Sequence, residues 1–156
     1  GNSVIRVMPN TPAQIGKGVS AISPGKNTSA ADLTLAKNLL SASGIVVEVS
    51  EDDQDAVTAL SGSGPAYFFS FIEAMVSAGV KLGLTNEIAT QLAIGTISGS
   101  AAMLKESGLD ATTLRKNVTS PNGTTAAALS VFTDKDLEKI VFDAMAAAKK
   151  RAQELA

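Results

Sequence analysis

The first third of the chain alternates short apolar runs with polar breaks, which predicts β-strands. Residues 4–8, 19–23 and 45–49 are rich in β-branched side chains and are bounded by Gly, Pro or Asn, a pattern typical of strands. Between the last two, residues 30–43 carry leucines at helical spacing and end at Gly44. These few elements are too small to form a stable sheet alone. We therefore expect one edge of a larger α/β sheet whose beginning is missing.

From Glu51 onward the pattern is helical. Residues 55–60 predict a short helix, followed by a break over residues 61–65. Apolar residues then recur at spacings of three and one until about Gly83, which predicts a helix with one apolar face. The members of this stripe are Phe68, Phe71, Ile72, Met75, Val76, Gly79 and Val80.

The next predicted helix has a face against which another helix can pack closely. Thr85 predicts the cap of a helix over residues 87–105. Its Gly95, Gly99 and Ala102 form a small-residue face against which another helix can pack tightly.

Three further helices are predicted before the C-terminus. Asp110 caps a short one, Ser120 caps one whose first residue is Pro121, and Thr133 or Asp134 caps the last. Apolar stripes on several helices exceed what one small bundle needs. We therefore expect a homo-oligomer, a dimer or higher, in which helices of two subunits pack together.

The amino-acid composition excludes several kinds of functional site and binding partner. The chain has 156 residues and a net charge of -2, so it lacks the basic surface typical of proteins that bind nucleic acid or anionic membranes. It contains no Cys and no His, which excludes disulfides, thiolate or imidazole metal sites and a Ser-His-Asp triad. No uninterrupted apolar run reaches the roughly 20 residues of a membrane span. We expect no metal, a cytoplasmic location and a chain that begins inside a longer protein.

Residues 118–125 predict a binding site for an anion. Ser120 is a good N-cap, and Pro121 suits the first helical position. Gly123 lets a ligand approach the backbone closely. Outward-facing amides are expected at Asn122, Gly123 and Thr124, and hydroxyls at Thr119, Ser120, Thr124 and Thr125. The set suits a carboxylate or phosphate, although an ordinary capped helix would show much of the same pattern.

Three segments in order, residues 7–12, 55–67 and 117–125, resemble pyrroline-5-carboxylate reductase, which makes proline. The resemblance covers nearly the whole chain, although members usually have Gly where this chain has Asn122. It implies an α+β fold. Residues 1–50 would be the end of a Rossmann domain that binds NADP or NAD, and residues 51–156 an all-α domain for dimerisation and substrate binding.

The resemblance also implies roles for individual residues. Thr58 would be catalytic, close to the imine nitrogen of the substrate. The remaining assignments are Ser120, Gly123, Thr124 and Thr125 on the substrate carboxylate, and Asn10, Pro12 and Asn117 beside the cofactor. From the residues alone, Thr58 is equally well explained as a helix hydroxyl bonded to its own backbone.

Other patterns carry weaker alternatives. The acidic run from Glu48 to Asp55 lacks the spacing of a metal loop and is expected to be a solvated linker that suits the start of a helix. The segment 62–64 lacks the third glycine of a dinucleotide-binding turn.

The predicted function is hydride transfer from NAD(P)H to the C=N bond of 1-pyrroline-5-carboxylate, with the isolated chain inactive. The alternatives are a non-catalytic helical oligomerisation module and a related imine or keto-acid reductase.

Overall fold

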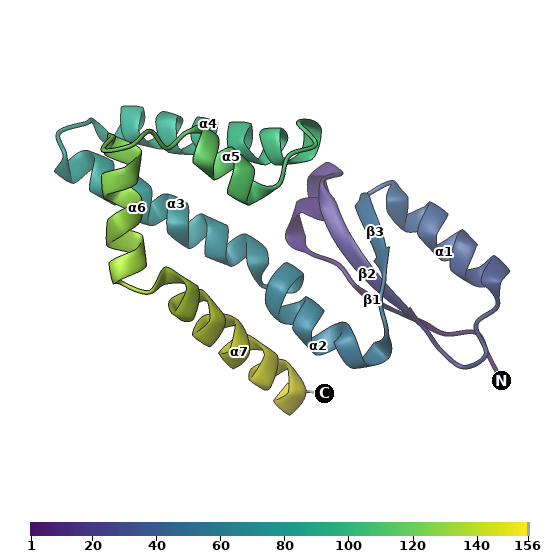
Figure 1. Ribbon diagram of the computed structural model, residues 1–156. Coiled ribbons are helices and arrows are strands. Elements are labelled where there is room, and N and C mark those ends of the chain that lie inside the picture. The colour runs from purple at the N-terminus through teal and green to yellow at the C-terminus, as the bar shows by residue number, and fades with distance from the viewer. Residues whose placement is uncertain (156) are drawn as a thin grey trace. The chain divides into compact units, whose positions relative to one another are not determined.

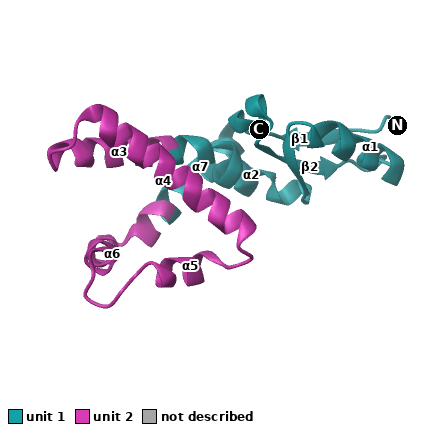
Figure 2. Cartoon of the chain, turned by 90° about the horizontal axis from the view of Figure 1, so that it is seen from above, with its two compact units in different colours: residues 1–68, 142–156 teal, residues 69–141 magenta. Residues whose placement is uncertain are grey.

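The structure is a computed structural model that describes residues 1–155. The chain divides into two compact units (Figure 2). Unit 1 consists of Gly1–Phe68 together with the C-terminal residues from Phe142 on, and unit 2 is Phe69–Val141.

Unit 1 contains a three-stranded sheet in the order β1-β2-β3 (Figure 1). β1 (Ile5–Met8) is antiparallel to β2 (Gly18–Pro24), and β2 is parallel to β3 (Gly44–Glu48). The helix α1 (Ala30–Ser41) connects the parallel pair and packs on β3. β2 is the centre of this sheet, and its Ile22 is completely buried. The predicted strands, helix and α+β class are confirmed, with boundaries that differ by one or two residues.

Local chemistry fixes the start of α1 and the start of β3. Ser29 and Asp32 form a reciprocal capping box, in which each side chain accepts a hydrogen bond from the backbone amide of the other. The hydrogen bonds from the Ser29 hydroxyl and amide lower the pKa of Asp32. After α1, Gly44 starts β3 with φ 143°, in close contact with the backbone of Gly18. Only glycine adopts such a backbone angle readily.

The helical segment after β3 is more continuous than predicted. The 3₁₀ turn η2 (Glu51–Asp53) leads into α2 (Gln54–Val57), the π-helical turn η3 (Thr58–Gly62) and then α3 (Gly64–Lys81). The predicted break over residues 61–65 is therefore wrong, since only Ser63 separates η3 from α3. Gly62 ends the widened turn η3 and Gly64 begins α3, so both glycines lie in helical segments instead of a loop.

Unit 2 is helical and includes α4 (Asn86–Glu106), α5 (Ala111–Asn117) and α6 (Thr124–Asp134). The predicted caps are confirmed at α4 and α5. The Thr85 hydroxyl accepts from an amide at 3.3 Å, and the Asp110 carboxylate accepts from another at 2.8 Å.

The predicted cap of the last helix is wrong. The last helix, α7 (Leu137–Leu155), is capped by the Asp136 carboxylate rather than by Thr133 or Asp134, because α6 continues through those two residues. Within this chain, α3 and α4 approach closely at Gly79, where an added Cβ would meet the Ala89 side chain at 3.1 Å; a close approach at the small-residue face of α4 stays a prediction. Nothing lies near Gly95 or Gly99 within the described chain.

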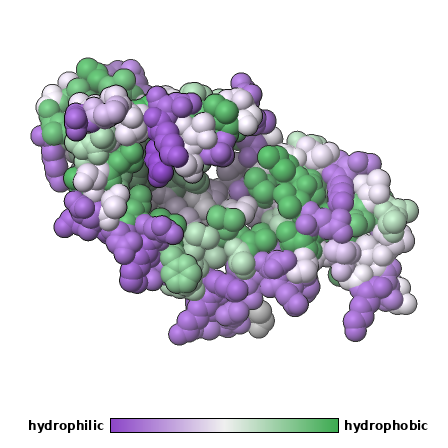
Figure 3. Space-filling view, viewed as in Figure 1, coloured by the Kyte–Doolittle hydropathy of each residue, from purple (hydrophilic) through white to green (hydrophobic). Residues whose placement is uncertain are grey.

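Much of the apolar surface is exposed. The chain has 10,980 Å² of accessible surface, whereas even two separate compact bodies of half its mass would expose about 8,800 Å² together. Figure 3 shows apolar residues, in green, at the surface of the face that it draws. The exposed apolar side chains of the chain include Phe68, Phe69, Phe132 and Phe142. No helix in the described part is long and apolar enough to cross a membrane.

Candidate functional site

Thr58 opens the π-helical turn η3. The amide of Ser63 donates to the Thr58 carbonyl at 2.9 Å, which closes the widened turn. The Tyr67 hydroxyl donates to the Ala59 carbonyl at 2.9 Å and so satisfies an acceptor within the same turn. Single π-helical turns inside helices are rare and occur frequently at functional sites.

The hydroxyl of Thr58 is already engaged with its own helix. Thr58 Oγ1 donates to the Gln54 carbonyl at 2.8 Å, which is the backbone bond that the alternative interpretation anticipated. The side chain is half-buried, so part of it faces solvent. Because the hydroxyl has donated its one proton, its oxygen can still accept a hydrogen bond.

Asn10 connects the loop after β1 to two other segments. Its Oδ1 accepts from the Val19 amide at 2.8 Å, and its Nδ2 donates to the Ser61 carbonyl at 3.2 Å. Pro12 lies in the following 3₁₀ turn η1 (Thr11–Ile15). Within unit 1 the structure therefore brings the loop with Asn10 and Pro12 against the turn that Thr58 opens.

The segment before α6 differs from the prediction. The Gly123 amide donates to the Ser120 carbonyl at 3.1 Å, and Asn122 has φ 58°. Residues 120–123 are thus a tight turn with a left-handed third residue. α6 begins at Thr124 with Gly123 as its N-cap, so Ser120 is not the cap and Pro121 is not the first helical residue. Asn122 adopts the unusual backbone angle that asparagine tolerates.

Within the part of the chain that the structure describes, the hydroxyls of Ser120, Thr124 and Thr125 have no hydrogen-bond partner. Thr119, in contrast, donates to the Arg115 carbonyl at 2.6 Å. Its hydroxyl proton is therefore not free for an anion, contrary to the expectation from the sequence. The amides of Thr124 and Thr125 open α6 and have no intrahelical acceptor.

Space, and not backbone angle, is what favours a small residue at position 123. Its φ is -81°, which any residue adopts. An added Cβ would overlap the Ser120 hydroxyl and lie 3.2 Å from the Ser120 carbonyl.

Asn117 is exposed and is the last residue of α5, directly before the segment that leads to this turn. A separate hollow of about 760 Å³ lies in unit 2 between α5, α6 and the first turn of α7. Its lining includes Arg115, Lys116, Phe132 and Val141, but none of the predicted substrate-binding residues.

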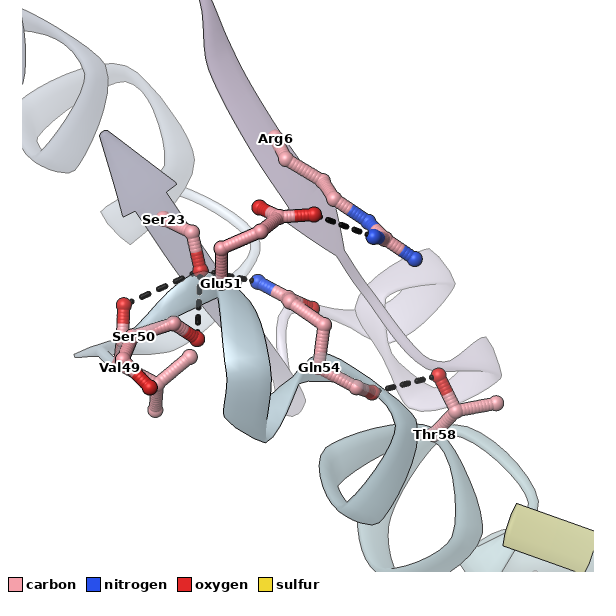
Figure 4. A network of polar contacts seen from close by, with 7 residues as sticks. All are labelled: Arg6, Ser23, Val49, Ser50, Glu51, Gln54 and Thr58. Carbon is pink, nitrogen blue, oxygen red and sulfur yellow. Dashed lines mark hydrogen bonds and ion pairs between the residues drawn. The ribbon is translucent and has the colours of Figure 1, made fainter. Parts of the chain in front are cut away.

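No sequence pattern points to the most buried polar side chain of the region. Gln54 is fully buried, and its Nε2 donates to Ser23 Oγ at 2.6 Å (Figure 4). Ser23 Oγ donates in turn toward the carbonyls of Val49, at 3.0 Å, and Ser50, at 3.2 Å. A glutamine beside three acidic residues has the pattern of a solvated helix start, and only the packing of α2 against β2 buries it.

The acidic run does not assemble a metal site. Glu51 pairs with Arg6 on β1, and the Asp53 carboxylate accepts from the Ser50 hydroxyl. The described residues contain no group of three or more His, Cys, Asp or Glu side chains placed to hold a metal ion.

Comparisons with known proteins agree on one family. A family model described as pyrroline-5-carboxylate reductase dimerisation matches residues 51–155. The pyrroline-5-carboxylate reductase of Corynebacterium melassecola is 45% identical over 99% of this chain and 57% of its own length. The Pseudomonas aeruginosa reductase is 47% identical over 98% of this chain and 56% of its own. The chain thus spans little more than half the length of these curated relatives.

Solved structures give the same result. A pyrroline-5-carboxylate reductase from Coxiella burnetii matches 99% of this chain and 58% of its own, with a TM-score of 0.96 and 38% identity. A pyrroline carboxylate reductase from Plasmodium falciparum, solved with NADP bound, matches 98% of this chain and 62% of its own, with a TM-score of 0.91 and 37% identity.

Proposed function

This chain belongs to the pyrroline-5-carboxylate reductase family, and on that premise we propose that it is the C-terminal part of such a reductase. The reaction is hydride transfer from a reduced nicotinamide cofactor to the C=N bond of 1-pyrroline-5-carboxylate, which gives proline. The chain matches little more than half of its relatives' length. The chain by itself is therefore expected to be inactive.

The start of α6 is the observation that carries this proposal. Ser120, Thr124 and Thr125 offer hydroxyls without partners in the described chain, next to unpaired amides at the positive end of a helix dipole. This combination suits a carboxylate. We assign Ser120, Gly123, Thr124 and Thr125 to the substrate carboxylate, with Gly123 leaving the backbone open.

Thr58 is assigned to the imine nitrogen of the substrate. The chain has no His and no Cys, so its polar side chains are hydroxyls, amides, carboxylates and the cationic groups of Lys and Arg. Reduction of a C=N bond needs mainly that the two reactants are held face to face. A partly exposed hydroxyl on a π-helical turn is suited to orient the nitrogen.

The cofactor is NADP or NAD, and it supplies the hydride when bound. Asn10, Pro12 and Asn117 are assigned to its nicotinamide end. Both functional groups of the Asn10 side chain bond to other segments of this chain, which fits a residue that shapes the loop around a ligand. NADP is favoured by the NADP-bound relative from Plasmodium falciparum.

We further propose a homo-oligomer, a dimer or higher. The description of the matching family model and the exposed apolar side chains support this assembly. Light scattering at micromolar concentration tests it, and a monomer would contradict it.

The reaction is tested with the full-length polypeptide by proline-dependent reduction of NADP⁺ at high pH. Loss of a hydrogen bond to a charged carboxylate should make Thr125→Ala about ten- to a hundred-fold poorer in kcat/KM. Thr133→Ala is the matched control, since Thr133 lies on the same helix and bonds to the Leu129 carbonyl. Equal activity of Thr125→Ala and wild type would contradict the assignment of Thr125 to the substrate carboxylate and would mean that other residues bind it. No activity with proline in the wild type would favour a scaffold or a reductase of another imine or keto acid.

A further inference from the structure

The buried amide of Gln54 is not explained by packing. Gln54 is fully buried, and its Oε1 is the one buried side-chain oxygen or nitrogen without a hydrogen-bond partner in the described chain. A buried polar atom without a partner lowers stability. Methionine would fill a similar volume without that cost. Stability alone therefore does not account for an amide at this position.

The amide fixes the first residue of α2 to the sheet. Gln54 Nε2 donates to Ser23 Oγ at 2.6 Å, and Ser23 Oγ donates to the Val49 carbonyl at 3.0 Å. Ser23 lies near the carboxyl end of β2, and Val49 directly follows the carboxyl end of β3. The start of α2 is thereby tied to two parallel strands of a close-packed interior, which resists displacement.

The main-chain carbonyl of the same residue sets the direction of the Thr58 hydroxyl. Thr58 Oγ1 donates its proton to Gln54 O at 2.8 Å, as Figure 4 shows. A hydroxyl has one proton and two lone pairs. Thr58 therefore has lone pairs for a ligand but no proton left to give it.

We propose that Gln54 is a positioning residue that holds Thr58 as a hydrogen-bond acceptor for the N–H of a protonated cyclic imine. This rests on the proposed function, in which Thr58 meets the imine nitrogen. Hydride addition to the carbon of a protonated C=N bond sends the π electrons to nitrogen, and the product is the neutral secondary amine. Its N–H is already in place. No proton has to pass through Thr58, in agreement with a hydroxyl whose proton is held by Gln54.

The test compares two ring acids of the same shape in the full-length polypeptide. One ligand is proline, which has N–H groups in its ring. The other is the same ring acid with an oxygen in place of the nitrogen, so it has no N–H group. The ratio of their dissociation constants is measured in each variant. Contacts with other residues that distinguish the two ligands contribute equally to this ratio in every variant. A change in the ratio between variants therefore reports on the Thr58 hydroxyl as hydrogen-bond acceptor.

Thr58→Val should reduce the preference for proline about tenfold or more, because a charge-assisted hydrogen bond is lost. Gln54→Met should reduce it roughly threefold in wild type and should have no further effect in the Thr58→Val background, since it acts through Thr58. Thr34→Val is the control. Thr34 makes the same kind of bond, to the Ala30 carbonyl at 2.8 Å in α1, and its loss should leave the ratio unchanged.

Two results overturn the proposal. One is an unchanged preference in Thr58→Val, and the other is an equal effect of Gln54→Met in the wild-type and Thr58→Val backgrounds. Ser23→Ala removes the acceptor of the Gln54 amide and provides the same comparison if Gln54→Met does not fold. Failure of the proposed function is distinguishable, because the wild type would then bind neither ring acid and would not reduce the cyclic imine.

Discussion

Asn10 is the residue whose removal should most clearly loosen the loop after β1. Its side chain accepts from the Val19 amide at 2.8 Å and donates to the Ser61 carbonyl at 3.2 Å. One bond fixes the loop to β2, and the other fixes it to the turn that begins at Thr58. Both bonds are part-buried, and a bond of this kind contributes about 0.5–1.5 kcal/mol. Asn10→Ala should therefore lower the free energy of unfolding by about 1–3 kcal/mol.

Asn10→Asp separates the two bonds. A carboxylate still accepts from the Val19 amide, but it cannot donate to the Ser61 carbonyl and places a negative charge against it. We expect a loss in unfolding free energy of about 1 kcal/mol from the missing bond, with the Val19 amide still protected from hydrogen exchange. In Asn10→Ala the same amide should exchange faster.

The assay is urea unfolding of the full-length polypeptide, followed by circular dichroism, together with hydrogen exchange at Val19. Gln14→Ala is the control, because Gln14 lies in the adjoining 3₁₀ turn, is exposed and makes no side-chain hydrogen bond in the described chain. If Asn10→Ala unfolds within about 0.5 kcal/mol of wild type, or if Val19 is equally protected in all variants, the bridging role is refuted.

Two further predictions concern stability. Gly44→Ala should destabilise by about 2–3 kcal/mol in urea unfolding, because its φ is 143° and the new Cβ would overlap the Gly18 backbone; Gly108→Ala, with φ 71° and open space around it, should cost only about 1 kcal/mol, and equal losses would contradict the overlap. Hydrogen bonds from the Thr113 amide and hydroxyl lower the pKa of Asp110 in the folded chain, so its stabilising effect is present above the unfolded pKa of about 3.9 and is lost as pH falls through the folded value. Asp110→Asn should therefore lower Tm near neutral pH and converge with wild type in acid, and a difference in Tm that is constant with pH would refute this.

Local patterns in the sequence were sufficient for most of the fold. The three strands, α1 and the caps at Thr85 and Asp110 follow from side-chain period and from residues that bond within a few positions. Such signals survive in any tertiary context because both partners are close in sequence. The family also follows from the order of three motifs, and the matches to residues 51–155 and to full-length reductases confirm it.

Prediction from the sequence failed where one segment fits two local structures equally well. Ser120 followed by Pro121 fits either a helix cap or a tight turn. The turn forms, with Asn122 in the left-handed region and Gly123 against Ser120, so α6 begins at Thr124. Small residues likewise only permit a close helix approach: within this chain Gly79 lies against Ala89, and a partner for the glycines of α4 stays a prediction.

Residue patterns alone predict most of the helices and strands, the family, and the hydroxyls that are candidates for the substrate. The tertiary structure, in contrast, sets the direction of the Thr58 hydroxyl proton. It buries Gln54, binds its amide to Ser23 on β2, and directs the Thr58 hydroxyl to the carbonyl of the same residue. The bond to Ser23 joins residues 31 positions apart. Neither hydrophobic period nor local capping specifies such a pair, since it arises from the packing of a helix on a sheet.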